Sequence, residues 1–242
     1  MDRRLRMYTK RRLKPSFFND FFRKFSVTGW LIIVNVIFFV FLFSLIGFSG
    51  EGSAENIFSL IALQPNAFFS GQIWTLLTSM FMHGNFTHLF VNMLSLFFIG
   101  NFVEKLIGRK RYFWIYMLSG LFAGLFFVFL AYFFGVSALG ERVFGSPEIF
   151  AVGASGAIFA LAGLLAVLTP NLKVYVFFII PMKMWIAIIF LLLVLWGASV
   201  GAGLPIGNTA HLGGLLVGLG YAIYLKKKYK KKTEMIRKYF GN

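Results

Sequence analysis

Six apolar runs, separated by short polar connections, dominate this chain of 242 residues. A helix needs about 20 mostly apolar residues to cross the hydrocarbon core of a bilayer. Only 13% of the residues are charged, about half the share that is usual in soluble domains. The pattern therefore predicts an all-α membrane protein with six transmembrane helices, at residues 30–48, 86–103, 112–135, 152–168, 184–200 and 209–225.

Positive charge is concentrated at the two ends of the chain and in alternate connections. Of 24 Lys and Arg residues, nine lie in residues 1–29, eight in 226–242, and only Arg142 lies in the first, third and fifth connections. Basic residues favour the cytoplasmic side, so both termini are predicted to be cytoplasmic. The expected organisation is a basic arm at 1–29, a six-span domain at 30–225 and a basic tail at 226–242.

The formal net charge of +16 would suggest nucleic acid as a partner in a soluble chain. Here the charge flanks the spans, which favours anionic lipid headgroups and argues against nucleic acid. The chain has no cysteine, which excludes disulfides, thiolate metal sites and a cysteine nucleophile. An integral protein of a prokaryotic plasma membrane is expected, and the sequence does not indicate an oligomeric state.

Polar residues inside spans are costly and often functional. His88 and Asn92 lie near the start of the second span, Ser155 near the start of the fourth and His211 near the start of the sixth. With six spans, all three starts face the outside. The reactive groups are thus predicted to share one depth, in the outer half of the bilayer.

Helical spacing also predicts a contact between the fourth and sixth spans. His211, Gly214 and Gly218 lie on one face of the sixth span, where the glycines leave almost no side chain. Small residues on the Ser155 face of the fourth span permit close approach of the two helices. Such packing would bring His211 towards Ser155.

Each residue alone also has a structural explanation. Ser155, between Gly153 and Gly156, fits helix packing as well as it fits a nucleophile beside free N–H groups. His88, Asn92 and His211 could be hydrogen-bond partners between helices. A metal site is disfavoured, because His83 and His88 are five residues apart and no carboxylate accompanies them.

Taken together, three motifs resemble the rhomboid intramembrane serine proteases over residues 72–224. They run from Trp74 through His83 and His88 to Asn92, from Gly153 to Phe159, and from Asn208 through His211 to Gly218. The resemblance implies a six-helix bundle and an endopeptidase that cuts membrane proteins, single-span or polytopic, within or near a span. It implies no metal and no cofactor.

The resemblance also implies residue roles. Ser155 would be the nucleophile and His211 the general base and acid, while His88, Asn92 and the Ser155 N–H would form the oxyanion hole. Supporting positions are His83, Gly153, Gly156, Phe159, Asn208, Gly214 and Gly218, and Glu104 matches a structural position of the family.

Two residues depart from the family pattern. Phe159 stands where the family often has a tyrosine that stacks on the catalytic histidine, so stacking is expected without the hydroxyl. Thr75 follows Trp74 where the family often has arginine, in the long loop at 49–73 that is expected to lie partly in the outer leaflet. The apolar stretch at 174–180 is expected either to extend the fifth span or to lie at the interface, with a break at Pro181 and Lys183.

Two other functions fit the spans. A non-proteolytic rhomboid-like protein that binds membrane clients would be expected to lack the serine or the histidine. A transporter or channel would be expected to carry charges or broken helices in mid-span.

Overall fold

The computed structural model describes residues 25–48, 51–176, 179–203 and 207–240. Most of the predicted arm at 1–29 lies outside these residues. Within the predicted tail at 226–242, the described part is helical to Tyr239, because α12 (Asn208–Lys228) is followed by α13 (Lys230–Tyr239).

Four of the described helical segments are long and apolar enough to cross a membrane. They are α2 (Val27–Phe48), the continuous helix formed by α6 (Phe86–Ser95), η1 (Leu96–Gly100) and α7 (Asn101–Ile107), then α8 (Arg109–Phe134) and α11 (Met184–Ala202). These confirm the first, second, third and fifth predicted spans as helices.

The other two predicted spans are α10 (Ser155–Leu168) and α12. Helix α10 has only 14 residues and begins three residues later than predicted. Helix α12 has 21 residues, but its glycines and its last three residues, which are lysines, lower its hydropathy. Both are helices within the bundle, and a count of six spans remains a prediction.

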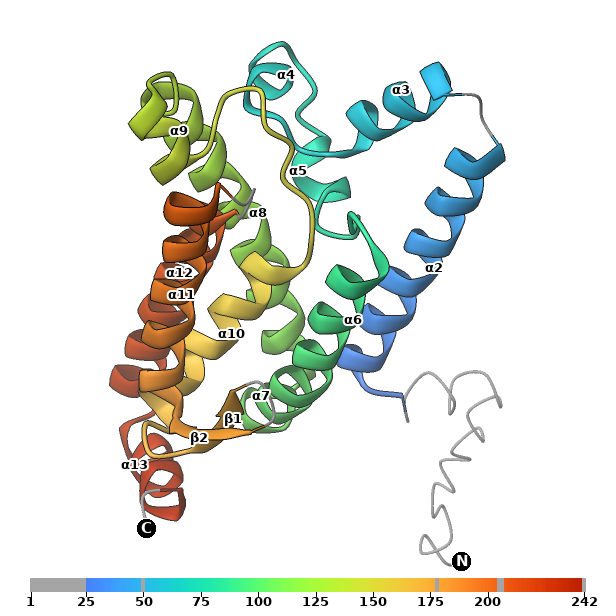
Figure 1. Ribbon diagram of the computed structural model, residues 1–242. Coiled ribbons are helices and arrows are strands. Elements are labelled where there is room, and N and C mark those ends of the chain that lie inside the picture. Colours follow the sequence, from blue (N-terminus) through green and yellow to red (C-terminus); the bar gives the residue numbers. More distant parts are fainter. Residues whose placement is uncertain (1–24, 49–50, 177–178, 204–206, 241–242) are drawn as a thin grey trace, which may run out of the picture.

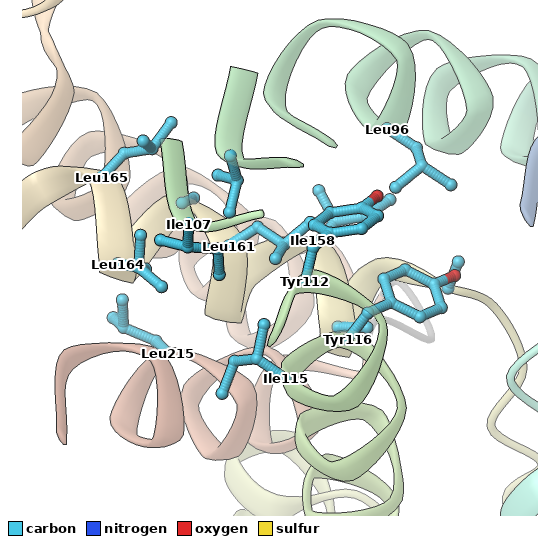
Figure 2. Packing of buried hydrophobic residues seen from close by; sticks show 14 of the residues in the cluster. Leu96, Ile107, Tyr112, Ile115, Tyr116, Ile158, Leu161, Leu164, Leu165 and Leu215 are labelled. Atoms are coloured by element: carbon cyan, nitrogen blue, oxygen red, sulfur yellow. The ribbon is translucent and has the colours of Figure 1, made fainter. Parts of the chain in front are cut away.

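Helix α10 occupies the centre of the bundle (Figure 1) and packs most extensively against α12 and α8. Ten of its 14 residues are buried. Figure 2 shows Leu161, Leu164 and Leu165 of α10 together with Tyr112 and Ile115 of α8, all of which belong to the main apolar core. A helix enclosed in this way needs small and apolar residues on every side.

The two ends of the bundle differ in charge. The start of α2, the α7–α8 turn and α13 lie at one end (Figure 1), where the described lysines and arginines gather. The opposite end carries α3 (Glu51–Ile61), α4 (Pro65–Phe69), α5 (Thr75–Thr78) and α9 (Ala138–Phe144) with Arg142. This geometry is the one that cytoplasmic termini require, and that placement stays a prediction.

A short hairpin departs from the all-helical expectation. Strands β1 (Lys173–Val176) and β2 (Ile180–Lys183) pair in antiparallel register, with Lys173 opposite Lys183 and Tyr175 opposite Pro181. The stretch at 174–180 therefore does not extend the fifth span. The predicted break is confirmed, because α11 begins at Met184.

Candidate active site

Ser155 and His211 are 56 residues apart in sequence and in direct contact in the fold. Nε2 of His211 lies 2.8 Å from Oγ of Ser155. Ser155 is the first residue of α10, and His211 lies in the first turn of α12 with only 8% of its surface exposed. The pair thus joins the same ends of two adjacent helices.

Two glycines of α12 make this contact possible. A Cβ on Gly214 would overlap the carbonyl oxygen of Gly156, and a Cβ on Gly218 would overlap that of Ala160. Both obstacles are backbone atoms of α10, which cannot turn aside as a side chain can. The predicted packing of this glycine face against the fourth span is confirmed, and it sets the separation of the helices that carry Ser155 and His211.

Phe159 fixes the plane of the histidine ring. Its ring centroid lies 4.5 Å from that of His211, and the two planes differ by 19°. Phe159 is one helical turn after Ser155, so α10 supplies both the serine and the surface against which His211 lies. The expected stacking therefore occurs with phenylalanine at this position.

The backbone that leads into Ser155 is held by the segments on either side of α4 and α5. Leu63 and Ala151 form an isolated antiparallel bridge, in which the backbone nitrogen of each residue lies 3.1 and 2.7 Å, respectively, from the carbonyl oxygen of the other. The N–H of Gly153 donates to the carbonyl of Ser79 at 2.8 Å. These bonds fix the position at which α10 begins, and thus the position of the serine.

Gly153 is required for two reasons. Its φ of +116° lies in a region that side chains disfavour. A Cβ there would also lie 2.9 Å from Cε1 and Nε2 of the His88 ring. The chain before the serine and the histidine of α6 therefore pack against each other directly.

His88 and Asn92 lie one turn apart in α6. Asn85 caps this helix, because its side chain accepts from the His88 N–H at 2.8 Å. The Nδ2 group of Asn92 donates to the His88 carbonyl at 2.8 Å, and its Oδ1 atom, buried, has no partner among the described residues. The second N–H of this amide has no acceptor among the described residues.

His83 and Asn208 are both buried, and among the described residues no hydrogen bond joins either of them to Ser155. The His83 ring is 2% exposed and lies 5.1 Å from the His88 ring, edge to face. His83 lies in the loop before α6, where burial, with a smaller effect of His88, lowers the pKa of His83 to about 4. Asn208, buried at the start of α12, has its Nδ2 atom 3.5 Å from the carbonyl of Leu195 in α11.

The loop with the Trp74–Thr75 departure is anchored by other contacts. Nε1 of Trp74 donates to the Leu60 carbonyl at 2.9 Å, and Oγ1 of Thr78 donates to that of Ile61 at 2.7 Å. Thr75 itself is fully buried and donates to the Gln72 carbonyl at 2.6 Å. A buried threonine thus occupies the position at which an arginine would need solvent or a counter-charge.

Sequence reasoning missed several of these anchoring residues. The Glu148 carboxylate accepts from the side chains of Asn66 and Gln64. These bonds connect the start of α4 to the segment that leads into Ser155. Thr209 donates to the Phe144 carbonyl at 3.2 Å and so connects α12 with α9. Neither contact has a local signal, since the partners are more than 60 residues apart.

The comparison with known proteins identifies the same family as the motifs. The rhomboid domain model matches residues 70–228. The chain is 34% identical over 184 residues to RHOMBOID-like protein 5 of Arabidopsis thaliana. This alignment covers 73% of this chain and 52% of that protein. It is 32% identical over 164 residues to the mitochondrial Rhomboid protein 1 of Saccharomyces cerevisiae, an alignment that covers 66% of this chain and 44% of that protein. It is 30% identical over 191 residues to Rhomboid protease GluP of Bacillus subtilis, covering 78% and 33%. The chain thus spans about half or less of these relatives.

Proposed function

The chain belongs to the rhomboid family, and from that premise we propose that it is an intramembrane serine endopeptidase that uses a Ser155–His211 dyad. One observation supports the proposal above all others: the 2.8 Å contact between Nε2 of His211 and Oγ of Ser155. A serine hydroxyl becomes a useful nucleophile when an adjacent base accepts its proton.

The proposed chemistry has two steps. Oγ of Ser155 attacks the substrate carbonyl while His211 takes the hydroxyl proton, and His211 then gives that proton to the leaving amine. Water next attacks the acyl-enzyme, with His211 again as the base. Stacking on Phe159 holds the imidazole in the plane that both transfers require.

The start of α10 is the proposed oxyanion hole. Backbone N–H groups in the first turn of a helix have no intrahelical acceptor, and Ser155 is the first residue of this helix. The free N–H of Asn92 and the ring of His88, which packs against Gly153, are the proposed additional donors. Removing one such donor commonly lowers turnover by about 100- to 1000-fold.

The length of α10 supports a site below the membrane surface. Fourteen residues of helix span about 21 Å, less than the roughly 30 Å of the hydrocarbon core. If the C-terminal end of α10, at Leu168, lies at the basic surface of the bundle, Ser155 lies inside the outer half of the bilayer. Water must then reach it from the side that carries α3, α4 and α9.

The proposed substrates are membrane proteins, single-span or polytopic, cut within or near a span. A helical substrate hides its carbonyls, so helix-weakening residues near the cut are expected to favour cleavage. The chain is an integral membrane protein. Residence in a prokaryotic plasma membrane remains a proposal, because the relatives include a mitochondrial yeast protein.

A cleavage assay with a single-span substrate in liposomes tests the proposal. We expect no product from Ser155→Ala or His211→Ala, and a cleavage rate lower by about 100-fold or more from Asn92→Ala. Ser59→Ala is the matched control, since Ser59 is half-buried on α3 and its hydroxyl donates to the carbonyl of Asn56 in the same helix. A fluorophosphonate probe should label the wild-type protein at Ser155.

Full activity of Ser155→Ala would refute the dyad. Failure of the wild-type protein both to take up the probe and to cut any substrate would instead favour the client-binding alternative, in which a rhomboid-like protein holds membrane proteins without cleaving them.

A further inference from the structure

Two cations lie close together at the end of the bundle that carries α13, and no carboxylate of the described residues pairs with either of them. Arg111 is in the first turn of α8, and Lys228 is the last residue of α12. Their charges are near enough to interact. In the described part of the chain neither forms an ion pair, and the one salt bridge found there joins Arg109 to Glu104.

Tyrosines hold these cations in place. Nη2 of Arg111 donates to the hydroxyl oxygen of Tyr229 at 2.8 Å, and Nζ of Lys228 donates to that of Tyr224 at 2.7 Å. The Arg111 guanidinium also lies 4.9 Å from the centre of the Tyr229 ring, and Lys228 lies 5.8 Å from it. Two elements more than 100 residues apart therefore converge on one ring.

The hydroxyl groups keep donor capacity. A phenol oxygen that accepts from a cation still has its own O–H to donate. Arg111 has further N–H groups, and Lys228 has two more. The cluster thus presents several donors and two positive charges, and among the described residues it lacks an acceptor of opposite charge.

The surroundings locate the cluster at a membrane boundary. Trp114, one turn after Arg111, is 52% exposed, and Tyr224 is 48% exposed. Exposed aromatic side chains at the ends of spans are typical of the headgroup level. Further lysines lie within four residues of Lys228 in sequence, namely Lys226, Lys227, Lys230, Lys231 and Lys232.

We infer that Arg111, Lys228 and the hydroxyls of Tyr224 and Tyr229 form a binding site for the phosphate of an anionic phospholipid headgroup. A guanidinium binds phosphate through paired N–H groups, while an ammonium adds a point charge. The acyl chains of such a lipid would lie along α8 and α12, beside the exposed Trp114. The site differs from diffuse attraction by the basic tail, because it is saturable and depends on geometry.

Native mass spectrometry of the detergent-solubilised chain tests the site. Phosphatidylglycerol and phosphatidylcholine with the same acyl chains are titrated into wild-type protein, into Arg111→Gln/Lys228→Gln and into Lys231→Gln/Lys232→Gln. The control removes the same charge from α13, where both lysines are exposed. We expect one tightly held phosphatidylglycerol in the wild type and the control, and about 10-fold weaker binding in the site variant.

Equal weakening of phosphatidylglycerol binding in both double variants would overturn the inference, since only net charge would then matter. Tight retention of phosphatidylcholine, or displacement of phosphatidylglycerol by millimolar inorganic phosphate, would overturn the assignment to an anionic lipid.

If the site variant fails to fold, Tyr229→Phe replaces it, because that change keeps the ring and removes one hydroxyl. Unchanged phosphatidylglycerol affinity in Tyr229→Phe would then overturn the site. Lipid binding does not depend on proteolysis, so the result is independent of the proposed function.

Discussion

The glycine face of α12 allows a strong prediction about activity. In Gly218→Ala, the new methyl group would overlap the carbonyl oxygen of Ala160 and lie 2.6 Å from its carbonyl carbon. Ordinary van der Waals contact begins at 3.4 Å. Since the obstacle is the backbone of α10, the two helices must separate.

The size of the effect follows from the geometry of the dyad. A separation on the order of 1 Å is needed to relieve the overlap, since packed interiors have little free space. Added to the 2.8 Å between Nε2 of His211 and Oγ of Ser155, it would leave no hydrogen bond. Misplacement of reacting groups by 1 Å can lower a rate by about 100-fold. Overpacking should also destabilise the fold by about 1–3 kcal/mol.

The same helix offers a matched control. Gly220 lies two residues after Gly218, and a Cβ there would meet nothing within 4 Å. Gly220→Ala makes the same chemical change with no obstacle, so its cleavage rate should stay within about two-fold of wild type and its stability should be equal or higher.

The assay compares cleavage of a single-span substrate by the three proteins in liposomes, with thermal unfolding in detergent measured in parallel. A folded Gly218→Ala protein with wild-type turnover would refute the reasoning, because it would show that the spacing of α10 and α12 does not control the dyad. Equal loss in Gly220→Ala would refute it too, since the effect would then come from glycine chemistry and not from contact.

Three further predictions concern other parts of the structure. Phe159→Tyr should keep the cleavage rate and Phe159→Leu should lower it by up to about 10-fold, because ring stacking on His211 contributes about 0.5–1.5 kcal/mol. Glu104→Gln should destabilise the fold by about 2–4 kcal/mol in detergent unfolding, since its carboxylate accepts from backbone amides at the start of α2 at 2.9 Å; unchanged unfolding, or an equal effect of the exposed Glu55→Gln, would contradict this. Burial lowers the pKa of His83 to about 4, so stability is full above the unfolded pKa near 6.5 and falls as the pH drops towards 4. The loss at pH 5 should be about 2 kcal/mol, and a His83→Gln protein with the same pH dependence of unfolding would argue against the assignment.

The sequence by itself determined where the apolar helices lie and which polar residues fall inside them. Hydropathy and helical period are local properties, so the runs now seen as α2, α8 and α11 could be predicted within a few residues. The spacing of His211, Gly214 and Gly218 was enough to predict which face of the sixth span would approach the fourth. The motifs also identified the family before any contact was known.

The tertiary structure decided everything that depends on partners distant in sequence. No local pattern pairs Leu63 with Ala151, so the bridge that fixes the start of α10 could not be anticipated. The hairpin at 173–183 was missed because its strands have four residues each, too few for a clear period. Ser155 could be singled out as a residue from the sequence, but the 2.8 Å contact with His211 depends on how closely two helix backbones approach. That distance is set by packing between two helix starts that are 56 residues apart in sequence, which local sequence preferences do not encode.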